Sequence, residues 1–598
     1  MSKDLVQKVI GMQPVMNLRR KKTLLHGIVF ALLPIVLFYL MEGYEHNPFI
    51  EVRKTAQLFN ILLFELLAWM FFALTKSGRA AIRILAATSM VFGLTNHYVM
   101  EFRSTPFVPW DIFSIRTAAS VAENYDFTPG IRVVLVTIGF VAILMLSHFL
   151  SFRFEKKLPI RLISAAAIMA VLVFFSERLQ NESFQLSNGL YPFLFTPAYM
   201  TKVNGMAVTF VMDMAYVKVD KPKGYNKTEA AQILEENGYL PQEAQQDSRP
   251  NLIVIMDEAF SDLAVLGEVK ASEDYMPYVH SLMEGADNTV SGYLHVSVCG
   301  GNTANTEYEF LTGNSMESLP AGSIPYQQYI KREVPSVADY LNSLGYETYA
   351  MHPYNSTGWD RDKVYPWMGF EHTLFLKDMS NVEKLRTYAS DAYDFKKVIE
   401  LYEKKEEKTP IFIFNVTMQN HGSYTETYDN FTPDITVEGC NSVALSQYLS
   451  LIKQTDEDFK NLISYFEDQE EKTMIVFFGD HQPANAVAKY IADGDTKEED
   501  RYKVPYVIWA NYDIKEECQA DTSVNYLAAT ALEIAGIPNS DYNQFLLDLK
   551  QYYPVYSAVN RIENENPSDG KPSKTAQEML LDYEKLQYYR LLDWEEEK

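Results

Sequence analysis

The chain has 598 residues, which is too long for one ordinary domain. It has 78 acidic and 53 basic side chains and a formal net charge of -25. The acidic balance disfavours a nucleic-acid partner, because phosphate backbones bind to basic faces. The three cysteines are too few and too scattered for a disulfide framework, and no CxxC pair is present for zinc or redox chemistry.

The N-terminal third contains five apolar stretches, each about as long as the twenty residues with which a helix crosses a bilayer. Because the first stretch is followed by four more, it is not a cleaved signal peptide. A buried helix bundle of a soluble protein fits poorly, because the flanks of the five runs alternate in charge. The sequence therefore predicts a five-helix transmembrane domain over residues 1–176, with spans at 24–41, 57–75, 81–99, 131–150 and 160–176.

The flanking charges predict the orientation of these helices. Three basic segments, "RRKK" (19–22), "KSGR" (76–79) and "RFEKK" (153–157), fall on one side. By the positive-inside rule this side is cytoplasmic. The segment 42–51 and the longer loop 100–130 fall on the other side. We therefore expect a multi-pass protein of the cell membrane with a cytoplasmic N-terminus and an extracellular C-terminal part.

Residues 177–250 are expected to form juxtamembrane helices and a linker. The stretch 177–216 has a helical pattern, whereas 218–250 is polar and interrupted by proline and glycine. The second stretch predicts a linker with one short helix.

Strand and helix patterns alternate from residue 251 onward. Helical patterns such as 336–345 and 523–538 lie between short apolar runs that are typical of strands buried on both faces. This alternation predicts an α/β domain with a mostly parallel sheet flanked by helices over 251–560. Residues 561–598 are expected to form a helical tail packed on this domain or extending from it. The predicted strands are 251–256, 347–352, 411–418, 473–481 and 504–510.

Polar side chains follow four of these strands, where the carboxyl edge of such a sheet places a ligand site. A single histidine at a strand end is usually a hydrogen-bonded surface residue, and "GDHQP" (479–483) alone could be a turn. Their coincidence at successive strand ends favours a functional site. The residues are Asp257, Glu258, His352, His421, Asp480 and His481.

Part of this set has the chemistry of a metal site. Carboxylate oxygens with one histidine suit manganese, magnesium or zinc better than copper or an iron-sulfur cluster. A metal held by Glu258, Asp480 and His481 would keep open positions, as catalytic metals do.

The segment "VCGGNTANTEYEFLTG" (298–313) contains a candidate nucleophile. A threonine hydroxyl attacks poorly until a metal or a base lowers its pKa. Thr303 lies in a glycine-rich loop before a predicted helix whose N-terminus favours an anion. In the alternative reading, Thr303 is an N-cap and Glu307 interacts with the helix dipole. Both readings stay open at this point.

The motifs together resemble one known family. The chain is similar to lipoteichoic acid synthase-type phosphoglycerol transferases of the alkaline phosphatase and sulfatase superfamily. Two further similar segments, "FRSTPFVPWDI" (102–112) and "LLDLKQYYPVYS" (546–557), extend the resemblance over nearly the whole chain. The matching motifs are "DEAF" (257–260), "GNTANTE" (301–307), "HPYNSTGWDRD" (352–362), "MQNH" (418–421) and "FGDH" (478–481).

The resemblance implies roles for eight residues. Thr303 would be the nucleophile and, with Glu258, Asp480 and His481, would bind the metal, with manganese the usual ion and magnesium or zinc as alternatives. The phosphoglycerol pocket would be lined by His352, Trp359, Arg361 and His421. Without the family, Trp359 and Arg361 would be read as a packed aromatic and a surface charge. An arginine in such a pocket can pair with a phosphate through two parallel hydrogen bonds.

The resemblance also implies a reaction. The donor would be phosphatidylglycerol, and the acceptor a lipoteichoic acid chain, a glycolipid or a cell-wall polysaccharide. Asn302 and Asn305 stand where the best-known synthases have lysine and aspartate, so the acceptor stays open. A cysteine-derived sulfatase nucleophile at Cys299 is disfavoured, because no C-x-P-x-R context surrounds it.

Two alternatives stay open as well. Phosphoethanolamine transferases share the fold and the threonine nucleophile, but they usually have several disulfides and extra histidine ligands. A non-catalytic membrane relative with a binding or regulatory function should have lost ligands, and the expected ligands are all in place.

Overall fold

The computed structural model describes residues 3–103, 106–114, 127–191, 197–239, 249–320, 323–491, 496–564 and 576–595. Ser104 and Thr105 of the "FRSTPFVPWDI" motif, residues 115–126 of the predicted outer loop, 240–248 of the linker and 565–575 and 596–598 of the tail lie outside the described residues. The chain divides into two compact units. The first comprises Met1–Met100, Thr105–Pro109 and Phe127–Lys218, and the second comprises Glu101–Ser104, Trp110–Asp126 and Val219–Lys598.

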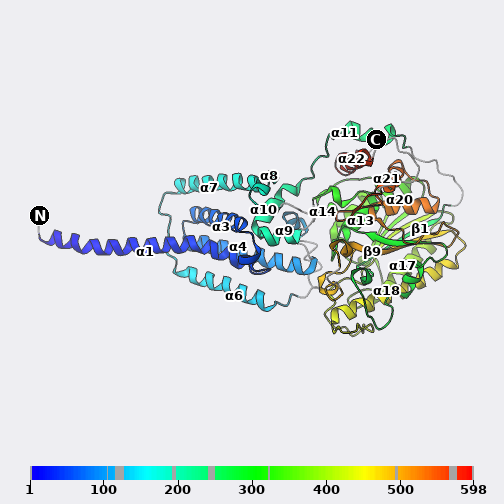
Figure 1. Ribbon diagram of the computed structural model, residues 1–598, viewed down its shortest axis with the longest axis horizontal. Coiled ribbons are helices and arrows are strands. Elements are labelled where there is room, and N and C mark those ends of the chain that lie inside the picture. The colour runs from blue at the N-terminus through cyan, green and yellow to red at the C-terminus, as the bar shows by residue number, and fades with distance from the viewer. Residues whose placement is uncertain are drawn as a thin grey trace. The chain divides into compact units, whose positions relative to one another are not determined.

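The first unit is helical (Figure 1). Four of its helices have segments long and apolar enough to cross a membrane: Lys22–Glu42, Lys54–Thr75, Ile131–Phe149 and Leu158–Leu179. Their parent elements are α1 (Lys3–Glu42), α3 (Lys54–Thr75), α6 (Ile131–Leu146) with the short turn η3 (Ser147–Phe149), and α7 (Leu158–Leu179).

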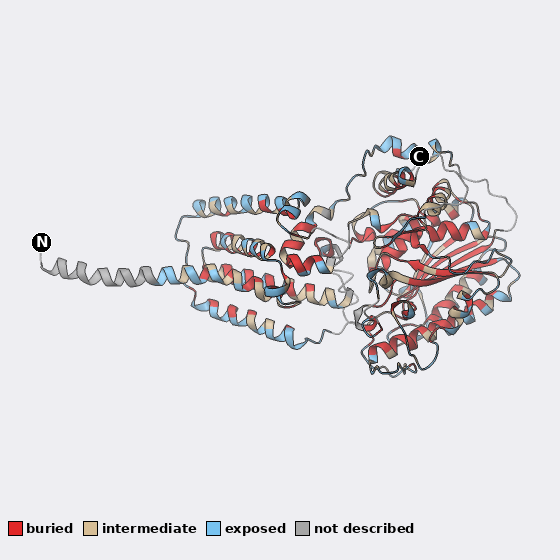
Figure 2. Cartoon of the chain, in the orientation of Figure 1, coloured by how far each residue is buried: buried red, intermediate tan, exposed pale blue. Residues whose placement is uncertain are grey.

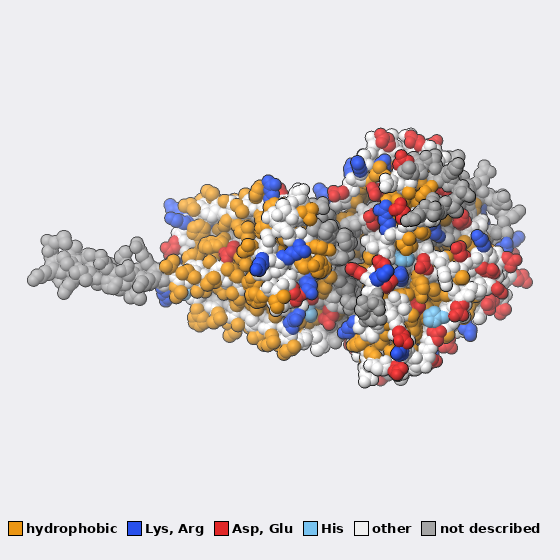
Figure 3. Space-filling model, viewed as in Figure 1, with side chains coloured by type: hydrophobic (Ala, Val, Ile, Leu, Met, Phe, Trp, Pro, Cys, Tyr) orange, Lys and Arg blue, Asp and Glu red, His pale blue; other side chains and the backbone are white. Residues whose placement is uncertain are grey.

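Apolar side chains remain exposed along the outer helices, as expected for helices that face lipid. Ile138 of α6 and Ile163 of α7 are 58% and 69% exposed. The same helices are largely pale blue in Figure 2, and the visible face of this unit is mostly hydrophobic in Figure 3. The multi-pass helical part of the predicted fold class is thereby supported by both length and surface.

The predicted third span, 81–99, lies within helix α4 (Gly78–Arg103). Among the described residues this helix is not one of the four that meet the membrane-span criteria. Its stretch between Arg83 and His97 contains several small and polar residues, which lower its hydropathy. Five crossings and their orientation therefore stay a prediction. Shorter helices follow the last span: α8 (Glu182–Ser187), α9 (Pro197–Asn204), α10 (Met206–Asp213) and the linker helix α11 (Lys227–Glu236).

The second unit is built on an eight-stranded sheet with the order β10-β2-β9-β8-β1-β7-β3-β4. The strands β8, β1, β7, β3 and β4 run parallel to one another, and β9 is antiparallel to both of its neighbours. The mostly parallel sheet is thereby confirmed. The strands are β1 (Asn251–Asp257), β2 (Thr289–His295), β3 (Glu347–His352), β4 (His372–Phe375), β7 (Ile411–Val416), β8 (Thr473–Gly479), β9 (Lys503–Ala510) and β10 (Thr522–Ser523).

Helices cover both faces of this sheet (Figure 1). Side chains alternate along a strand, so Val254 of β1 faces one core and Ile255 faces the other. The Val254 face packs against α13 (Thr303–Thr312), α15 (Val337–Ser343), α16 (Arg361–Trp367) and α20 (Val524–Ala535). The Ile255 face packs against α12 (Pro277–Met283), α17 (Asp391–Lys404) and α18 (Val443–Glu467).

The sequence prediction overlooked strands β2, β4 and β10. Strand β2 reads "TVSGYLH", in which serine and glycine interrupt the apolar run, and β10 contains only two residues.

The C-terminal helix α22 (Ala576–Tyr588) of the second unit packs with α11 and α21 (Asp541–Tyr552) in a separate apolar cluster that includes Ile233, Leu546 and Tyr583.

Candidate active site

Strand order brings the predicted acidic residues together. Strands β1 and β8 are parallel neighbours with Asp257 opposite Gly479, so Glu258 and Asp480 leave the sheet side by side. His352 ends β3, and His421 lies in the loop after β7, which separates β3 from β1. All these strand ends lie at the same edge, because the four strands are parallel.

Glu258, Asp480 and His481 form a buried cluster. One ligand atom of each lies within 4.8 Å of the others. His481 Nε2 is 3.3 Å from Asp480 Oδ2 and 3.8 Å from Glu258 Oε1. His481 Nδ1 lies 2.9 Å from the carbonyl oxygen of Gln482, which only accepts, so this nitrogen has the proton. In the singly protonated ring, the Nε2 lone pair then faces a carboxylate oxygen.

This geometry fits a cation. Asp480 Oδ2 and His481 Nε2 are buried and have no hydrogen-bond partner among the described residues. Burial, followed by the neighbouring charge of Asp480, raises the pKa of Glu258 well above its usual value, and burial likewise raises the pKa of Asp480. Two buried carboxylates and a lone pair at such distances repel one another unless a cation lies between them. The donor set therefore suits a divalent metal, as predicted.

Thr303 lies beside this cluster. It is the first residue of α13, and its Oγ1 donates to Glu258 Oε2 at 3.2 Å. Asn302, with φ 67°, occupies the N-cap position, so Thr303 is not the helix cap. Thr306, one turn later, donates to the carbonyl oxygen of Asp480 at 2.8 Å and fastens the helix to the β8 loop. The N-cap reading of Thr303 is therefore replaced by a hydroxyl directed at the acidic cluster.

Strained backbone positions surround the site. Four non-glycine residues here have a positive φ, which costs about 1 kcal/mol or more in most side chains. They lie directly after Glu258, directly before Thr303 and directly before Arg361. Such strain persists where the surrounding structure requires a particular backbone path. The residues are Ala259 (51°), Asn302 (67°), Trp359 (57°) and Asp360 (58°).

Arg361 forms a buried ion pair that the sequence prediction overlooked. Its Nη2 lies 2.5 Å from Glu307 Oε1, and its Nε lies 3.0 Å and 3.3 Å from the two carboxylate oxygens. Tyr365 donates to Glu307 Oε2 at 2.7 Å. Arg361 and Glu307 are 3% and 0% exposed. The Nε and Nη2 edge of the guanidinium therefore faces Glu307, which leaves Nη1 and the second N–H of Nη2 for a ligand.

The two pocket histidines are both uncharged near neutral pH. Burial lowers the pKa of His352 well below its usual value, and the Arg361 charge lowers it further. Burial lowers the pKa of His421 to about 4. His352 Nδ1 lies 2.9 Å from the carbonyl oxygen of Val416, and His421 Nδ1 lies 2.8 Å from that of Gly422. Nδ1 therefore has the proton in both rings, and each Nε2 is left as an acceptor for a hydroxyl group of a ligand.

Trp359 lies in the short turn η7 (Gly358–Asp360), directly before Arg361. Its ring is partly buried against the apolar core that contains Tyr308 and Phe310 of α13. The structure therefore places Trp359 next to the predicted pocket residue Arg361, whereas its contact with a glycerol group stays a prediction.

Further polar residues next to the acidic cluster are linked to it by hydrogen bonds. Thr417 Oγ1 accepts from the backbone nitrogen of Glu258 at 3.1 Å and donates to Asp257 Oδ2 at 3.0 Å. Asn420 donates to Asp257 Oδ1 at 2.9 Å. Asp257 thus holds the β7 loop and is not part of the cluster of Glu258, Asp480 and His481. The sequence signal for Thr417 and Asn420 was their place directly after a buried strand.

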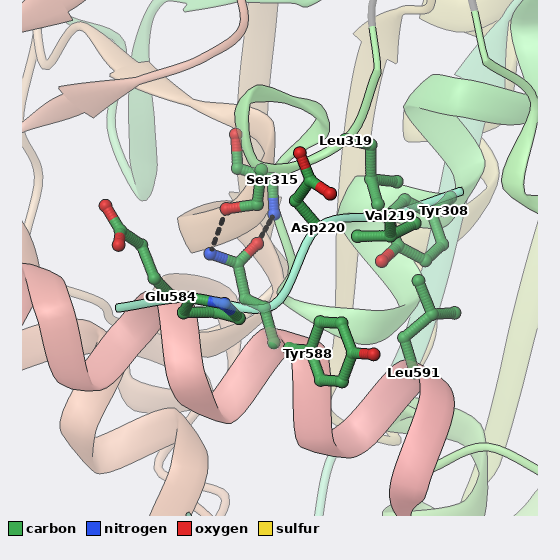
Figure 4. A pocket seen from close by; sticks show the side chains of 11 residues that line it. Val219, Asp220, Tyr308, Ser315, Leu319, Glu584, Tyr588 and Leu591 are labelled. Atoms are coloured by element: carbon green, nitrogen blue, oxygen red, sulfur yellow. Dashed lines mark hydrogen bonds between the residues drawn. The ribbon is translucent and has the colours of Figure 1, made fainter. Parts of the chain in front are cut away.

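A separate hollow lies between the C-terminal helix and the far end of α13 (Figure 4). Gln587 crosses it, accepting from the backbone nitrogen of Ser315 at 2.6 Å and donating to Ser318 Oγ at 2.9 Å. None of the predicted site residues lines this hollow. Gln587 thus connects the C-terminal helix to the segment after α13. The hollow is not the predicted substrate pocket.

Comparisons with known proteins agree with this geometry. Residues 250–537 match the Sulfatase family. A putative cyclic beta-1,2-glucan modification protein of Rhizobium meliloti (strain 1021) is 32% identical over 405 residues, which cover 64% of this chain and 61% of that protein. The lipoteichoic acid synthase of Staphylococcus aureus (strain USA300) is 25% identical over 326 residues, covering 50% of this chain and 47% of the synthase. The chain thus spans 61% and 47% of the length of these two relatives.

Among solved structures, the Streptococcus pyogenes phosphoglycerol transferase GacH, in complex with sn-glycerol-1-phosphate, superposes with a TM-score of 0.50 and 22% identity. The superposition covers 62% of this chain and 94% of that chain, and it shows the shared fold. The C-terminal part of this protein is thus similar to sulfatase domains in sequence and shares its fold with this phosphoglycerol transferase. The predicted resemblance to lipoteichoic acid synthase-type proteins of the alkaline phosphatase and sulfatase superfamily is confirmed, as is the predicted fold class.

Proposed function

We propose that this protein is a membrane-anchored phosphoglycerol transferase that moves glycerol phosphate from phosphatidylglycerol to an acceptor hydroxyl. The single observation that supports it most is the hydroxyl of Thr303, hydrogen-bonded to Glu258 within the acidic cluster. The lipoteichoic acid synthase relative and the fold shared with a phosphoglycerol transferase agree with this donor chemistry. The acceptor would be a lipoteichoic acid chain, a glycolipid or a cell-wall polysaccharide, and the glucan-modifying relative favours a carbohydrate.

Four residues would hold the metal, which we propose to be manganese, with magnesium or zinc as alternatives. When bound, the ion would neutralise the charge of the donor phosphate and lower the pKa of the attacking hydroxyl. The carboxylates supply hard oxygen ligands, and the imidazole supplies a nitrogen that all three metals accept. The four are Glu258, Thr303, Asp480 and His481.

In the first step, Thr303 Oγ1 attacks the phosphorus of phosphatidylglycerol. Its proton leaves along the hydrogen bond to Glu258 Oε2. The bond from phosphorus to the diacylglycerol oxygen breaks, and that oxygen takes up the same proton from Glu258 through water. The products are diacylglycerol and a glycerophospho-threonine, so that one proton has passed in net from threonine to diacylglycerol.

In the second step, the acceptor hydroxyl attacks the same phosphorus, and its proton passes through water to Glu258. The bond from phosphorus to Thr303 Oγ1 breaks, and this oxygen regains its proton from Glu258. Arg361 Nη1 would donate to a phosphate oxygen, and the Nε2 atoms of His352 and His421 would accept from the acceptor hydroxyl or from the glycerol hydroxyls. Trp359 would form one wall of the glycerol pocket. Water competes with the acceptor at this step, so slow release of glycerol phosphate is expected.

The membrane helices explain why donor and domain would meet. We propose that the catalytic domain lies outside the cell and the N-terminus inside, so that the donor lipid comes from the outer leaflet. The four candidate spans precede the sulfatase domain in the chain, as in a membrane-anchored enzyme.

The test follows diacylglycerol release from acyl-labelled phosphatidylglycerol by the purified full-length protein with manganese. We expect release that EDTA and Thr303→Ala abolish. Thr312→Ala is the matched control, because Thr312 ends the same helix and its hydroxyl bonds only at that helix end. It donates to the carbonyl oxygen of Tyr308 and accepts from the backbone nitrogen of Asn314. Release from phosphatidylethanolamine instead would show a phosphoethanolamine transferase. No release from either lipid would favour a non-catalytic relative.

A further inference from the structure

A small hairpin beside the active site contacts the loop that contains His421. Its strands are β5 (Lys384–Leu385) and β6 (Tyr388–Ala389), with Arg386 in the turn between them. We propose that this hairpin positions His421 for the transfer reaction, with Arg386 holding the loop backbone and Tyr388 orienting the imidazole. The proposal rests on the proposed function and adds two positioning residues to it.

Arg386 donates hydrogen bonds to three backbone carbonyl oxygens of one loop. Its Nη2 donates to the carbonyl oxygens of Gln419 and His421, both at 2.7 Å, and its Nη1 donates to that of Ser423 at 2.8 Å. The residue is only 5% exposed. A guanidinium presents several donors in a fixed planar fork, which the single ammonium of lysine cannot reproduce. The path of the loop from 419 to 423 is therefore specified by one side chain.

Tyrosine rings surround the same guanidinium. Its central carbon lies 5.8 Å, 5.5 Å and 5.8 Å from the ring centres of Tyr388, Tyr424 and Tyr428. These distances permit cation–π attraction, which is stronger in a buried setting than at an exposed one. The rings and the carbonyls together enclose the cation. Arg386 therefore acts through the loop and not by direct contact with a substrate.

Tyr388 contacts the protonated nitrogen of His421. Its hydroxyl lies 3.1 Å from His421 Nδ1 and donates to the carbonyl oxygen of Gly422 at 3.3 Å. His421 Nδ1 also lies 2.8 Å from that carbonyl, which can only accept, so Nδ1 is the protonated nitrogen. Nε2 is then the hydrogen-bond acceptor of the neutral ring. A histidine oriented in this way can take the proton of an attacking hydroxyl.

The hairpin itself is anchored to the loop that follows. Asn430 donates to the carbonyl oxygens of Lys384 and Arg386, at 3.0 Å and 3.1 Å.

A row of rings connects the hairpin to both histidines. The ring centres of Tyr388 and His421 lie 5.2 Å apart, and those of Tyr354 and Tyr388 lie 5.9 Å apart. This row of rings continues to His352, whose ring centre is 6.3 Å from that of Tyr354. Hairpin, loop and both pocket histidines thus form one contiguous group.

The experiment measures steady-state glycerol phosphate transfer by the full-length protein in phosphatidylglycerol nanodiscs with manganese. We expect Tyr388→Phe and Arg386→Lys each to lower the rate about 10-fold to 100-fold, as loss of an orienting partner commonly does. In a His421→Ala background the same substitutions should change the rate less than about twofold, because residues that act through one another are not additive. Equal losses in both backgrounds would overturn the proposal.

The matched control is Tyr346→Phe. Tyr346 is equally buried, and its hydroxyl donates to the carbonyl oxygen of Pro250 at 2.9 Å, but it precedes β3 at the amino edge of the sheet. We expect this substitution to leave the transfer rate within about twofold of wild type, since it alters no contact of the site. A loss as large as that of Tyr388→Phe would show a general effect of buried tyrosine hydroxyls and contradict the proposal.

Hydrogen exchange tests the positioning without depending on turnover. We expect faster amide exchange of residues 417–423 in Arg386→Lys and Tyr388→Phe than in wild type, and no change there in Tyr346→Phe. Unchanged exchange in Tyr388→Phe, with a melting temperature near that of wild type, would overturn the proposal. If the wild-type protein consumes neither lipid, the proposed function fails, and the exchange data still decide whether the hairpin orders the loop.

Discussion

Two buried polar sites, one in each unit of this chain, have opposite effects on stability. In the helical unit, Asn60 is 0% exposed and fully hydrogen-bonded. Its Nδ2 donates to the carbonyl oxygens of Ala56 and Asn204 at 2.8 Å and 2.7 Å, and its Oδ1 accepts from the backbone nitrogen of Val208 at 3.1 Å. The side chain thereby satisfies the first turn of α10, which would otherwise bury its N–H groups unpaired.

At the carboxyl edge of the sheet the situation is reversed. Glu258 and Asp480 are buried beside each other, and Asp480 Oδ2 has no hydrogen-bond partner among the described residues. Burial raises the pKa of both carboxyls, which is the direction expected of groups that repel each other in the metal-free protein. The comparison teaches that polar burial stabilises the fold around Asn60 and costs stability at the acidic cluster, where the arrangement suits a ligand.

The largest expected effect is that of Asp480→Asn. Asparagine can still accept from the backbone nitrogen of Ala259, which lies 2.7 Å from Asp480 Oδ1, but it removes one of two repelling charges. We expect lipid turnover to fall at least about 10³-fold while the metal-free protein gains about 1 kcal/mol of stability. Metal content, turnover and melting temperature in EDTA are the measurements. A lower melting temperature in EDTA would contradict the contrast between the two units.

The next effect is that of Glu307→Gln, which tests whether Arg361 needs its partner. Glutamine can accept one hydrogen bond but leaves the Arg361 charge buried without a counter-charge, and breaking such a pair typically costs about 3–5 kcal/mol. We expect kcat/KM to fall about 10-fold to 100-fold, because Arg361 would turn away from the phosphate.

Glu309→Gln is the control for this change. Glu309 is a buried glutamate on the same helix, and its Oε1 accepts from Ser297 Oγ and from the backbone nitrogen of Met316, both at 2.8 Å. Comparable activity losses in the two variants would show that any change in α13 disturbs the site and that the ion pair has no specific function.

The strand ends and the residues that follow them could be predicted from the sequence, because continuous apolar runs predict buried strands and parallel order then brings their ends together. The partner of Arg361 could not be predicted in this way. Glu307 and Arg361 are 54 residues apart, and nothing local indicates that a helix on one face of the sheet presents its fifth residue to another helix. The hairpin with Arg386 was missed for the same reason, since two-residue strands leave no periodic pattern.

Asn60→Leu is expected to affect stability alone. Leucine fills the space but leaves the Val208 nitrogen and the Asn204 carbonyl oxygen without their side-chain partner, at a cost of about 2–4 kcal/mol. Thermal unfolding in detergent measures the loss, and turnover per folded molecule should stay within about twofold of wild type. Leu58→Ala, at a position 65% exposed on the same helix, should have little effect. A specific loss of turnover in Asn60→Leu would give the helical unit a catalytic purpose and break the comparison.

The smallest effect concerns His280 of α12, which lies between two aspartates in the second unit. Its Nδ1 is 2.9 Å from Asp274 Oδ2, and its Nε2 is 3.7 Å from Asp262 Oδ2. Burial alone would lower the pKa of His280, but these two contacts outweigh it and raise the pKa to about 9. The protonated ring is thus favoured in the folded state, and its contribution is complete below about pH 6.5, the usual pKa of histidine.

That contribution disappears as the pH rises through about 9, because the folded protein then loses the proton that the unfolded chain had already lost. We therefore expect His280→Gln to lower the melting temperature at pH 6 but to match wild type at pH 10, as measured by thermal unfolding at both values. Glutamine retains a donor for Asp274, so the difference reports the charge. Here, unlike at the acidic cluster, the two carboxylates already have a cationic partner. A destabilisation that does not depend on pH would show that the contact is packing and not charge.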